Sequence, residues 1–98
     1  MKERQHYKSQ ARLLKALANE TRLMIIDRLS QGRCHVGELV RLVGLDQSTV
    51  SKHLSVLRSV GVVEDERHGS TVYYMLVTPC VLDFFACTRK VLSKKKHT

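Results

Sequence analysis

The sequence predicts a small, mainly α-helical domain with one β-hairpin, in the order helix, helix, helix, helix, hairpin, helix. Two observations support this fold class. Up to about residue 60, apolar residues recur every three or four positions, which is the period of an amphipathic helix. After Gly61, apolar and polar residues alternate within "VVEDERHGSTVYYML" (62–76), which is the period of a strand. No internal repeat or linker-like segment divides the sequence, so residues 1–98 are expected to form a single domain.

Three helices are expected in the first half of the chain. The segment 7–20 carries leucines at helical spacing up to Asn19, which is a good N-cap for a second helix over 20–30. A third helix is expected over 36–44, where Gly44 ends it. The apolar residues at helical spacing in the first helix are Leu13, Leu14, Leu17 and Ala18. The second helix carries Leu23, Ile26 and Leu29 on one face, and the third is expected to place Leu39, Val40 and Val43 inward.

The fourth helix is expected over about 47–60, with Asp46 as its N-cap. Its core-facing stripe is formed by Val50, Leu54 and Leu57, at positions i, i+4 and i+7. The opposite face and the flanks carry Gln47, Ser48, Thr49, Ser51, Lys52, His53 and Ser55. An ordinary solvated helix face carries Glu–Lys pairs, so this hydroxyl-rich row favours a polar partner instead.

The third and fourth helices are joined by a short turn that contains Gly44, and this spacing is typical of a helix-turn-helix. In that motif the second helix enters the major groove of DNA. Gln can pair with adenine, Ser and Thr bond to several bases, Lys suits a phosphate oxygen, and His can serve either role. We therefore predict that double-stranded DNA is contacted by Gln47, Ser48, Thr49, Ser51, Lys52 and His53.

The hairpin over about 62–76 has the tip "ERHGST", in which Arg67 and His68 stand beside a glycine. A basic side chain at such a tip can reach a phosphate or a narrow minor groove, where arginine is favoured electrostatically. Both residues are therefore predicted to contact DNA. The alternative is that Arg67 pairs with Glu64 or Glu66 within the hairpin.

A last helix is expected over about 80–95, because Pro79 suits a first helical turn. Its inner rows are expected to contain Val81, Phe84, Phe85, Thr88 and Leu92. A domain of 98 residues buries only part of its surface, and association with another copy is a common remedy.

Composition and charge narrow the classes of function. The formal net charge of +8 favours a polyanionic partner, above all nucleic acid. No apolar run reaches the ~18 residues of a membrane helix, and the N-terminus lacks the apolar core of a signal peptide, so a cytoplasmic protein without membrane contact is expected. No glycine-rich phosphate loop, paired carboxylates or Ser–His–Asp arrangement indicates an enzyme. A protein-interaction module of the same fold remains the alternative to a DNA-binding domain.

The chain resembles the ArsR/SmtB family of bacterial winged helix-turn-helix repressors over about residues 10–78. The resemblance is carried by "LKALANETRLMIIDRL", "VGELVRLVGLDQSTVSKHLSVLRSVGVV" and "ERHGSTVYYML". It implies a homodimer held by the first and last helices, which binds a near-palindromic operator and releases it when an effector binds. It also implies that the recognition helix lies at 47–60 and that Arg67, His68, Gly69 and Ser70 belong to the wing.

Three cysteines, Cys34, Cys80 and Cys87, are an odd number in a chain without a secretory signal, so free thiols or a metal site are expected rather than a disulfide framework. Cys80 and Cys87 would lie on one face of the last helix, ~10 Å apart, which is too far for a disulfide within one helix. Antiparallel packing of two such helices would bring Cys80 of one subunit near Cys87 of the other, with Cys34 as a candidate third ligand.

Three roles for these thiols stay open. Soft thiolates suit arsenite, antimonite, Cu(I), Cd or Zn. A thiol pair can instead switch as a disulfide in response to an oxidant or reactive sulfur, or the cysteines can simply pack as small apolar residues. Family members that bind metal at the third helix carry Cys-x-Cys before Asp-Leu, whereas here His35, Val36 and Gly37 precede Glu38. The resemblance therefore does not carry that metal site over to this chain.

Overall fold

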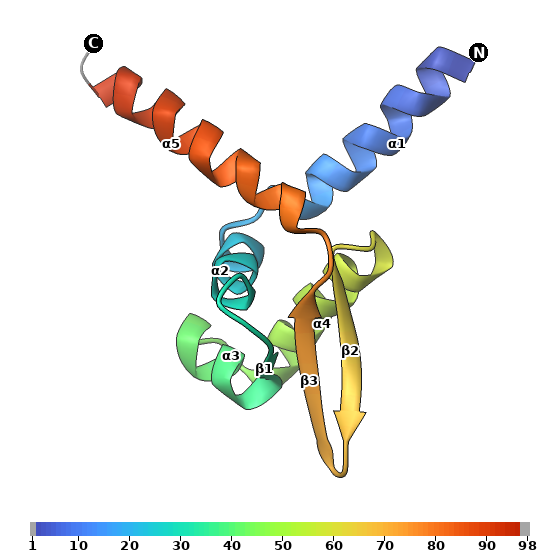
Figure 1. The fold of residues 1–98 in the computed structure, drawn as a ribbon, viewed down its shortest axis with the longest axis vertical. Coiled ribbons are helices and arrows are strands. Elements are labelled where there is room, and N and C mark those ends of the chain that lie inside the picture. The colour runs from blue at the N-terminus through green and yellow to red at the C-terminus, as the bar shows by residue number, and fades with distance from the viewer. Residues whose placement is uncertain (1, 97–98) are drawn as a thin grey trace.

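The computed structural model describes the backbone of residues 2–96 and the side chains of residues 3–94. The elements, in chain order, are α1 (Lys2–Leu17), α2 (Glu20–Leu29), β1 (Cys34–His35), α3 (Val36–Val43), α4 (Gln47–Ser59), β2 (Val63–His68), β3 (Thr71–Leu76), the 3-10 turn η1 (Pro79–Val81) and α5 (Leu82–Lys96) (Figure 1). The predicted order of four helices, a hairpin and a helix is confirmed, with β1 and η1 as additions. Within residues 2–96, no helix is both long and apolar enough to span a membrane.

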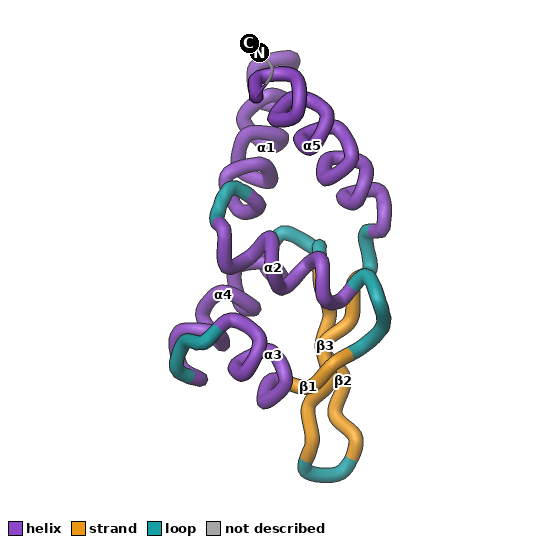
Figure 2. Tube along the Cα trace, turned by 90° about the vertical axis from the view of Figure 1, so that its left-hand side faces the viewer, coloured by secondary structure: helices purple, strands orange, loops and turns teal. Residues whose placement is uncertain are grey.

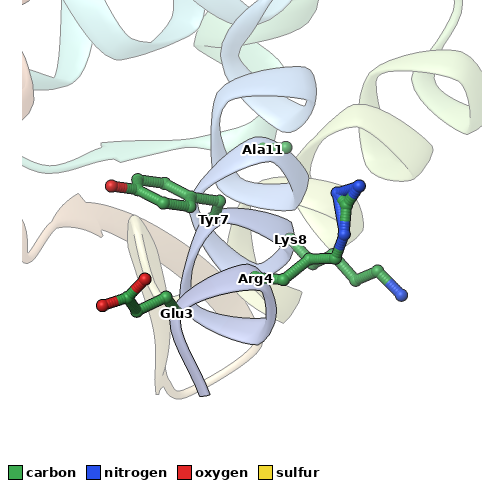
Figure 3. A pocket seen from close by; sticks show the side chains of 5 residues that line it. All are labelled: Glu3, Arg4, Tyr7, Lys8 and Ala11. Carbon is green, nitrogen blue, oxygen red and sulfur yellow. The ribbon is translucent and has the colours of Figure 1, made fainter. Parts of the chain in front are cut away.

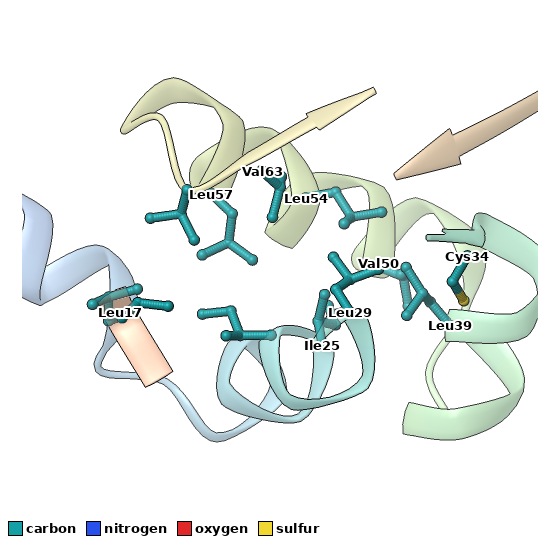
Figure 4. Packing of buried hydrophobic residues seen from close by; sticks show 12 residues of the cluster. Leu17, Ile25, Leu29, Cys34, Leu39, Val50, Leu54, Leu57 and Val63 are labelled. Carbon is teal, nitrogen blue, oxygen red and sulfur yellow. The ribbon is translucent and has the colours of Figure 1, made fainter. Parts of the chain in front are cut away.

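The core lies where α2, α3 and α4 meet the base of the hairpin. Ile25 and Ile26 of α2, Leu39 of α3 and Leu57 of α4 are almost completely buried in one cluster (Figure 4). The predicted stripe of α4 is buried throughout, since Val50 and Leu54 belong to the same cluster. The core therefore holds the helix-turn-helix on one side and leaves the other side of α4 open.

The apolar face predicted for α2 is only partly buried, because Ile26 and Leu29 belong to the core but Leu23 does not. Leu23 is 38% exposed, whereas Ile25 is completely buried. The reason is that the buried face of α2 is centred on Ile25, Ile26 and Leu29, where α3 and α4 pack, so Leu23 falls beside α5 instead.

The helices α1 and α5 project from one end of the molecule and diverge, while the hairpin extends at the other end (Figures 1 and 2). Phe84 and Leu92 were predicted to lie on the inner rows of the last helix, yet they are 51% and 64% exposed, and Leu14 of α1 is 47% exposed. Most of each helix lies beyond the core and has no neighbour there, which is why these faces stay exposed within a single copy.

The three strands form an antiparallel sheet in the order β1-β3-β2. The hairpin pairs Val63 with Leu76 at its base and His68 with Thr71 at its tip. The dipeptide Cys34–His35, for which no strand was predicted, pairs with Tyr74 and Tyr73 of β3 as a short strand. Two residues are too few to show a strand period, so only the open edge of β3 determines this pairing.

The expected caps are present. The Asn19 side chain accepts a hydrogen bond from the Arg22 amide at 3.1 Å, which caps α2. Gly44 adopts φ +72° and ψ +24°, and this left-handed conformation ends α3 so that the chain can turn into α4. α4 ends at Ser59, with Val60 as its C-cap.

The last helix begins later than predicted. Pro79, Cys80 and Val81 form the 3-10 turn η1, and α5 starts only at Leu82. Cys80 therefore lies on η1 and Cys87 on α5, rather than both on one continuous α-helix. The tight turn after β3 is the physical reason, because a proline at its first position favours a short turn before the longer helix begins.

Candidate nucleic-acid interface

The outer side of α4 is the candidate DNA-binding surface. Gln47, Ser48 and Lys52 are exposed, and Thr49 and Ser51 are half-buried on its flanks. The structure thus brings five of the predicted contact residues onto one surface at the N-terminal half of α4. Among the side-chain hydrogen bonds and ion pairs of residues 3–94, none involves the side chain of Gln47, Ser51 or Lys52. Those three side chains are free to bind a partner.

The first turn of α4 is organised by Asp46. Its Oδ1 accepts hydrogen bonds from the Thr49 amide at 2.7 Å and from the Ser48 hydroxyl at 2.9 Å. The hydrogen bond from the Thr49 amide is the main cause that holds the pKa of Asp46 below its ordinary value. The carboxylate therefore stays ionised and fixes the start of the helix, while it turns the Ser48 hydroxyl back toward the cap.

His53 is also predicted to contact DNA, but it already has a partner inside the protein. The Nε atom of Arg22, near the start of α2, donates to His53 Nδ1 at 3.1 Å. Partial burial, and then the nearby charge of Arg22, lowers the pKa of His53 below its ordinary value. His53 is thus a neutral, half-buried side chain at the edge of the surface.

At the tip of the wing, Gly69 takes φ +64°, which the tight turn requires. Arg67 and His68 are both exposed beside it. The alternative pairing of Arg67 with Glu64 or Glu66 is not found among the described ion pairs, because Glu66 contacts His68 instead.

Arg33 is a basic residue of this region that sequence reasoning missed. Its guanidinium lies 4.7 Å from the ring centre of Tyr73, and Nη1 lies 3.3 Å from His68 Nε2. No local motif marks Arg33, since it reaches the wing only because β1 pairs with β3. It adds a positive charge beside the tip of the hairpin.

An ion pair fixes the base of the wing to α4. The Nη1 atom of Arg58 donates to Asp65 Oδ2 at 2.9 Å, and this links the last turn of α4 to β2. The helix α4 and the wing are therefore joined to each other near the base of the hairpin.

The three cysteines lie in different surroundings within one copy. Cys34 is completely buried in the core, and burial raises the pKa of its thiol. Cys80 on η1 and Cys87 on α5 are exposed. In the part of the chain with described side chains, no group of three or more His, Cys, Asp and Glu residues is placed to hold a metal ion. His35 and Glu38, next to Cys34, instead form an ion pair at 3.3 Å.

Two of the hollows on the diverging helices differ in character. An apolar groove of ≈ 300 Å³ lies where α1, α2 and α5 meet, and it is lined by Leu14, Leu17, Ala18, Leu23, Val81, Phe84, Phe85 and Thr88. A second hollow, of ≈ 470 Å³, is lined only by α1 residues, namely Glu3, Arg4, Tyr7, Lys8 and Ala11 (Figure 3). The first has the character of a protein contact surface because its lining is almost entirely apolar.

Comparison with known proteins gives a family match that includes the third and fourth helices, α3 and α4. The family model for "Bacterial regulatory protein, arsR family" matches residues 19–65, which run from the cap of α2 into β2. The HTH-type transcriptional regulator Rv0081 of Mycobacterium tuberculosis is 38% identical over 89 residues, which cover 90% of this chain and 78% of that protein. Its crystal structure matches with a TM-score of 0.82 and 37% identity, over 93% of this chain and 92% of that one.

Two further relatives are informative. The homodimeric winged helix-turn-helix DNA-binding domain of Mb0332 from Mycobacterium bovis, a possible ArsR-family regulator, matches with a TM-score of 0.81 and 34% identity over 98% of this chain and 90% of that one. The biofilm growth-associated repressor of Xylella fastidiosa is 42% identical over 66 residues, which cover 67% of this chain and 58% of that protein.

These similarities confirm the predicted winged helix-turn-helix class and the prediction that the chain is a regulator rather than an enzyme. The agreement of the family model, the relatives and the fold leads to one conclusion: the chain belongs to the ArsR family of bacterial transcriptional regulators.

Proposed function

We propose that two copies of this protein bind a near-palindromic operator in double-stranded DNA as a repressor. In this arrangement α4 of each copy enters the major groove, and each wing reaches the neighbouring minor groove or its phosphates. The observation that carries the proposal is the outer side of α4, which holds no acidic residue from Gln47 to Ser59 and leaves Gln47, Ser51 and Lys52 unengaged.

The chemistry of this surface suits both kinds of DNA contact. The amide of Gln47 can pair with an adenine edge, and Thr49 can contact a base through its hydroxyl or its methyl group. Lys52, and Arg67 at the wing, supply the positive charge that phosphates require. His53 would act from the flank as a neutral hydrogen-bond donor, and His68 from the tip of the wing.

The dimer is supported by the diverging helices. Leu14, Phe84 and Leu92 are each about half exposed or more, and they lie on the two helices that leave the core. A second copy would cover these apolar faces, as the homodimeric Mb0332 domain of Mycobacterium bovis exemplifies for a relative. Dimerisation would also match the two half-sites of a palindrome with two recognition helices.

The experiment is a titration of a fluorescently labelled fragment of the protein's own promoter, followed by anisotropy at several salt concentrations. Lys52→Ala should weaken binding to every sequence and reduce the salt dependence, because one phosphate contact is lost. Gln47→Ala or Thr49→Ala should cost about 1–3 kcal/mol and relax base preference at one position per half-site. Lys90→Ala is the matched control, since it removes the same charge from exposed α5.

Unchanged operator affinity in both Lys52→Ala and Gln47→Ala would contradict the assignment of α4 as the recognition helix. Operator affinity that is insensitive to salt would instead favour a protein-interaction module.

We also propose that an effector releases the operator by acting at the exposed thiols of Cys80 and Cys87. Their exposure favours them over Cys34, whose burial and raised pKa keep its thiol protonated and sequestered. A thiophilic ion, such as arsenite, Zn, Cd or Cu(I), would bind these thiolates. In the alternative, an oxidant or reactive sulfur would join them as a disulfide between subunits.

To test this, arsenite, Zn, Cd, Cu(I) and then a mild oxidant are added in turn to the reduced protein on its operator, with Cys80→Ser and Cys87→Ser alongside. Release by one agent in the unaltered protein but not in the two variants identifies the thiols as the sensor and defines their chemistry. Persistence of the complex with all five agents would contradict a thiol sensor.

A further inference from the structure

Arg22 forms the only described side-chain hydrogen bond between α2 and the predicted recognition helix. Within residues 3–94, its Nε donates to His53 Nδ1 of α4 at 3.1 Å, and its Nη1 donates to the carbonyl oxygen of Ala16 at 3.0 Å. One half-buried guanidinium therefore bridges the last turn of α1, the first turn of α2 and the middle of α4.

Both acceptors of this bridge are neutral. Among residues 3–94, no carboxylate forms an ion pair with Arg22. Guanidinium is a donor at every nitrogen, so His53 must present a lone pair at Nδ1. A neutral imidazole with an unprotonated Nδ1 carries its proton on Nε2, so the contact selects one tautomer of His53.

The bridge of Arg22 also connects the helix proposed to form the dimer with the helix proposed to bind DNA. Ala16 lies at the end of α1, which belongs to the diverging pair proposed to form the dimer, while His53 lies beside Thr49 and Lys52 on α4. Arginine is suited to this role because its rigid, planar fork holds two acceptors at fixed angles, which the single ammonium group of lysine cannot reproduce.

We propose that Arg22 is a positioning residue for DNA recognition, which holds α4 against the end of α1 and keeps His53 in the Nε2-protonated tautomer. This inference rests on the proposed operator binding. It assigns Arg22 an effect on DNA affinity that is exerted through His53 rather than by direct contact with a phosphate.

The test measures how much Arg22→Lys weakens operator binding in three proteins: the unaltered protein, the His53→Asn variant and the His53→Leu variant. Arg22→Lys keeps the positive charge and removes the two-pronged geometry. In the unaltered protein it should weaken operator binding roughly tenfold, a coupling typical of residues in one hydrogen-bond network. The same cost is expected in His53→Asn, because the asparagine side-chain oxygen can replace Nδ1 as the acceptor. In His53→Leu, which has no acceptor, Arg22→Lys should cost nothing further.

Two results would overturn the proposal. An unchanged affinity for Arg22→Lys in the unaltered protein would mean that the bridge does not position α4. An equal cost of Arg22→Lys in His53→Leu and in the unaltered protein would mean that Arg22 acts independently of His53. Lys52→Ala and Gln47→Ala serve as references: if the unaltered protein fails to bind the operator, or if both of these variants bind it unchanged, the proposed function fails rather than the role of Arg22.

A second measurement reads the tautomer of His53 directly in the unaltered protein. Nitrogen-15 NMR of the histidine rings in the unaltered dimer distinguishes the two neutral tautomers, and the signals of His53 are identified by their loss in His53→Asn. The Nε2-protonated form with a hydrogen-bonded Nδ1 is expected. Protonation at Nδ1, or a mixture of the two tautomers, would overturn the proposal.

Discussion

The Asp46 carboxylate accepts hydrogen bonds from the Thr49 amide and the Ser48 hydroxyl, so one side chain fixes the first turn of α4. These contacts lower the pKa of Asp46 in the folded protein. The stability that the carboxylate contributes is therefore present above its unfolded pKa and is lost as the pH falls through the folded pKa.

Asp46→Ala should accordingly lower the urea midpoint of unfolding at pH 7, and the difference from the unaltered protein should shrink as the pH falls through the folded pKa of Asp46. Asp46→Asn is the control, because asparagine caps a helix without a charge and should retain much of the stability at neutral pH. A difference that persists undiminished at acid pH would show that the charge of Asp46 is not the cause.

Cys34 differs from the other two cysteines in its surroundings. Because it is buried in the core and its pKa is raised, it should react with iodoacetamide far more slowly than Cys80 and Cys87 at pH 8 in the native protein. Mass spectrometry of peptides after timed alkylation checks this order, with urea-unfolded protein as the control in which all three react. Equal native rates would contradict the burial of Cys34.

At the scale of the elements, Gly44 determines how α3 turns into α4. Its φ of +72° lies in the left-handed region, and an added Cβ would meet no atom within 4 Å, so a side chain there is strained but not blocked. Gly44→Ala should destabilise the fold by about 1–2 kcal/mol. Gly44→Asn should cost less, because asparagine tolerates this conformation. Urea unfolding measures both, and equal stability of all three proteins would contradict the strain.

The helices and the hairpin could be predicted because their signals are local. The stripe of Val50, Leu54 and Leu57 indicates both that α4 is a helix and which of its sides is buried. β1 could not be predicted, since its two residues pair only because the edge of β3 lies beside them. The contact of Arg22 with His53 could not be predicted for the same reason, because it joins elements that are distant in sequence.

At the scale of the whole molecule, the structure separates two surfaces. The helices α1 and α5 diverge at one end, while the wing extends at the other (Figure 1). The apolar side chains exposed on α1 and α5 would be covered by a second copy, and the basic and hydroxyl side chains on α4 and the wing would be covered by DNA. Because the dimer sets the distance between the two copies of α4, loss of the dimer should also reduce operator affinity.

Phe84→Glu tests this link. Phe84 is 51% exposed and lines the apolar groove at the start of α5, so a charge there should leave the core intact but oppose burial in a dimer. Sedimentation equilibrium should show monomers, and operator affinity should fall by more than one order of magnitude, since each half-site is then bound separately.

Met24→Glu is the matched control, because it introduces the same charge at a side chain of α2 that is 42% exposed and lies outside that groove. This variant should remain a dimer. Leu92→Glu, further along α5, should act like Phe84→Glu if the dimer contact continues along the helix. A Phe84→Glu protein that stays dimeric and keeps its operator affinity would place the contact between copies elsewhere. The apolar groove between α1 and α5 would then need another occupant.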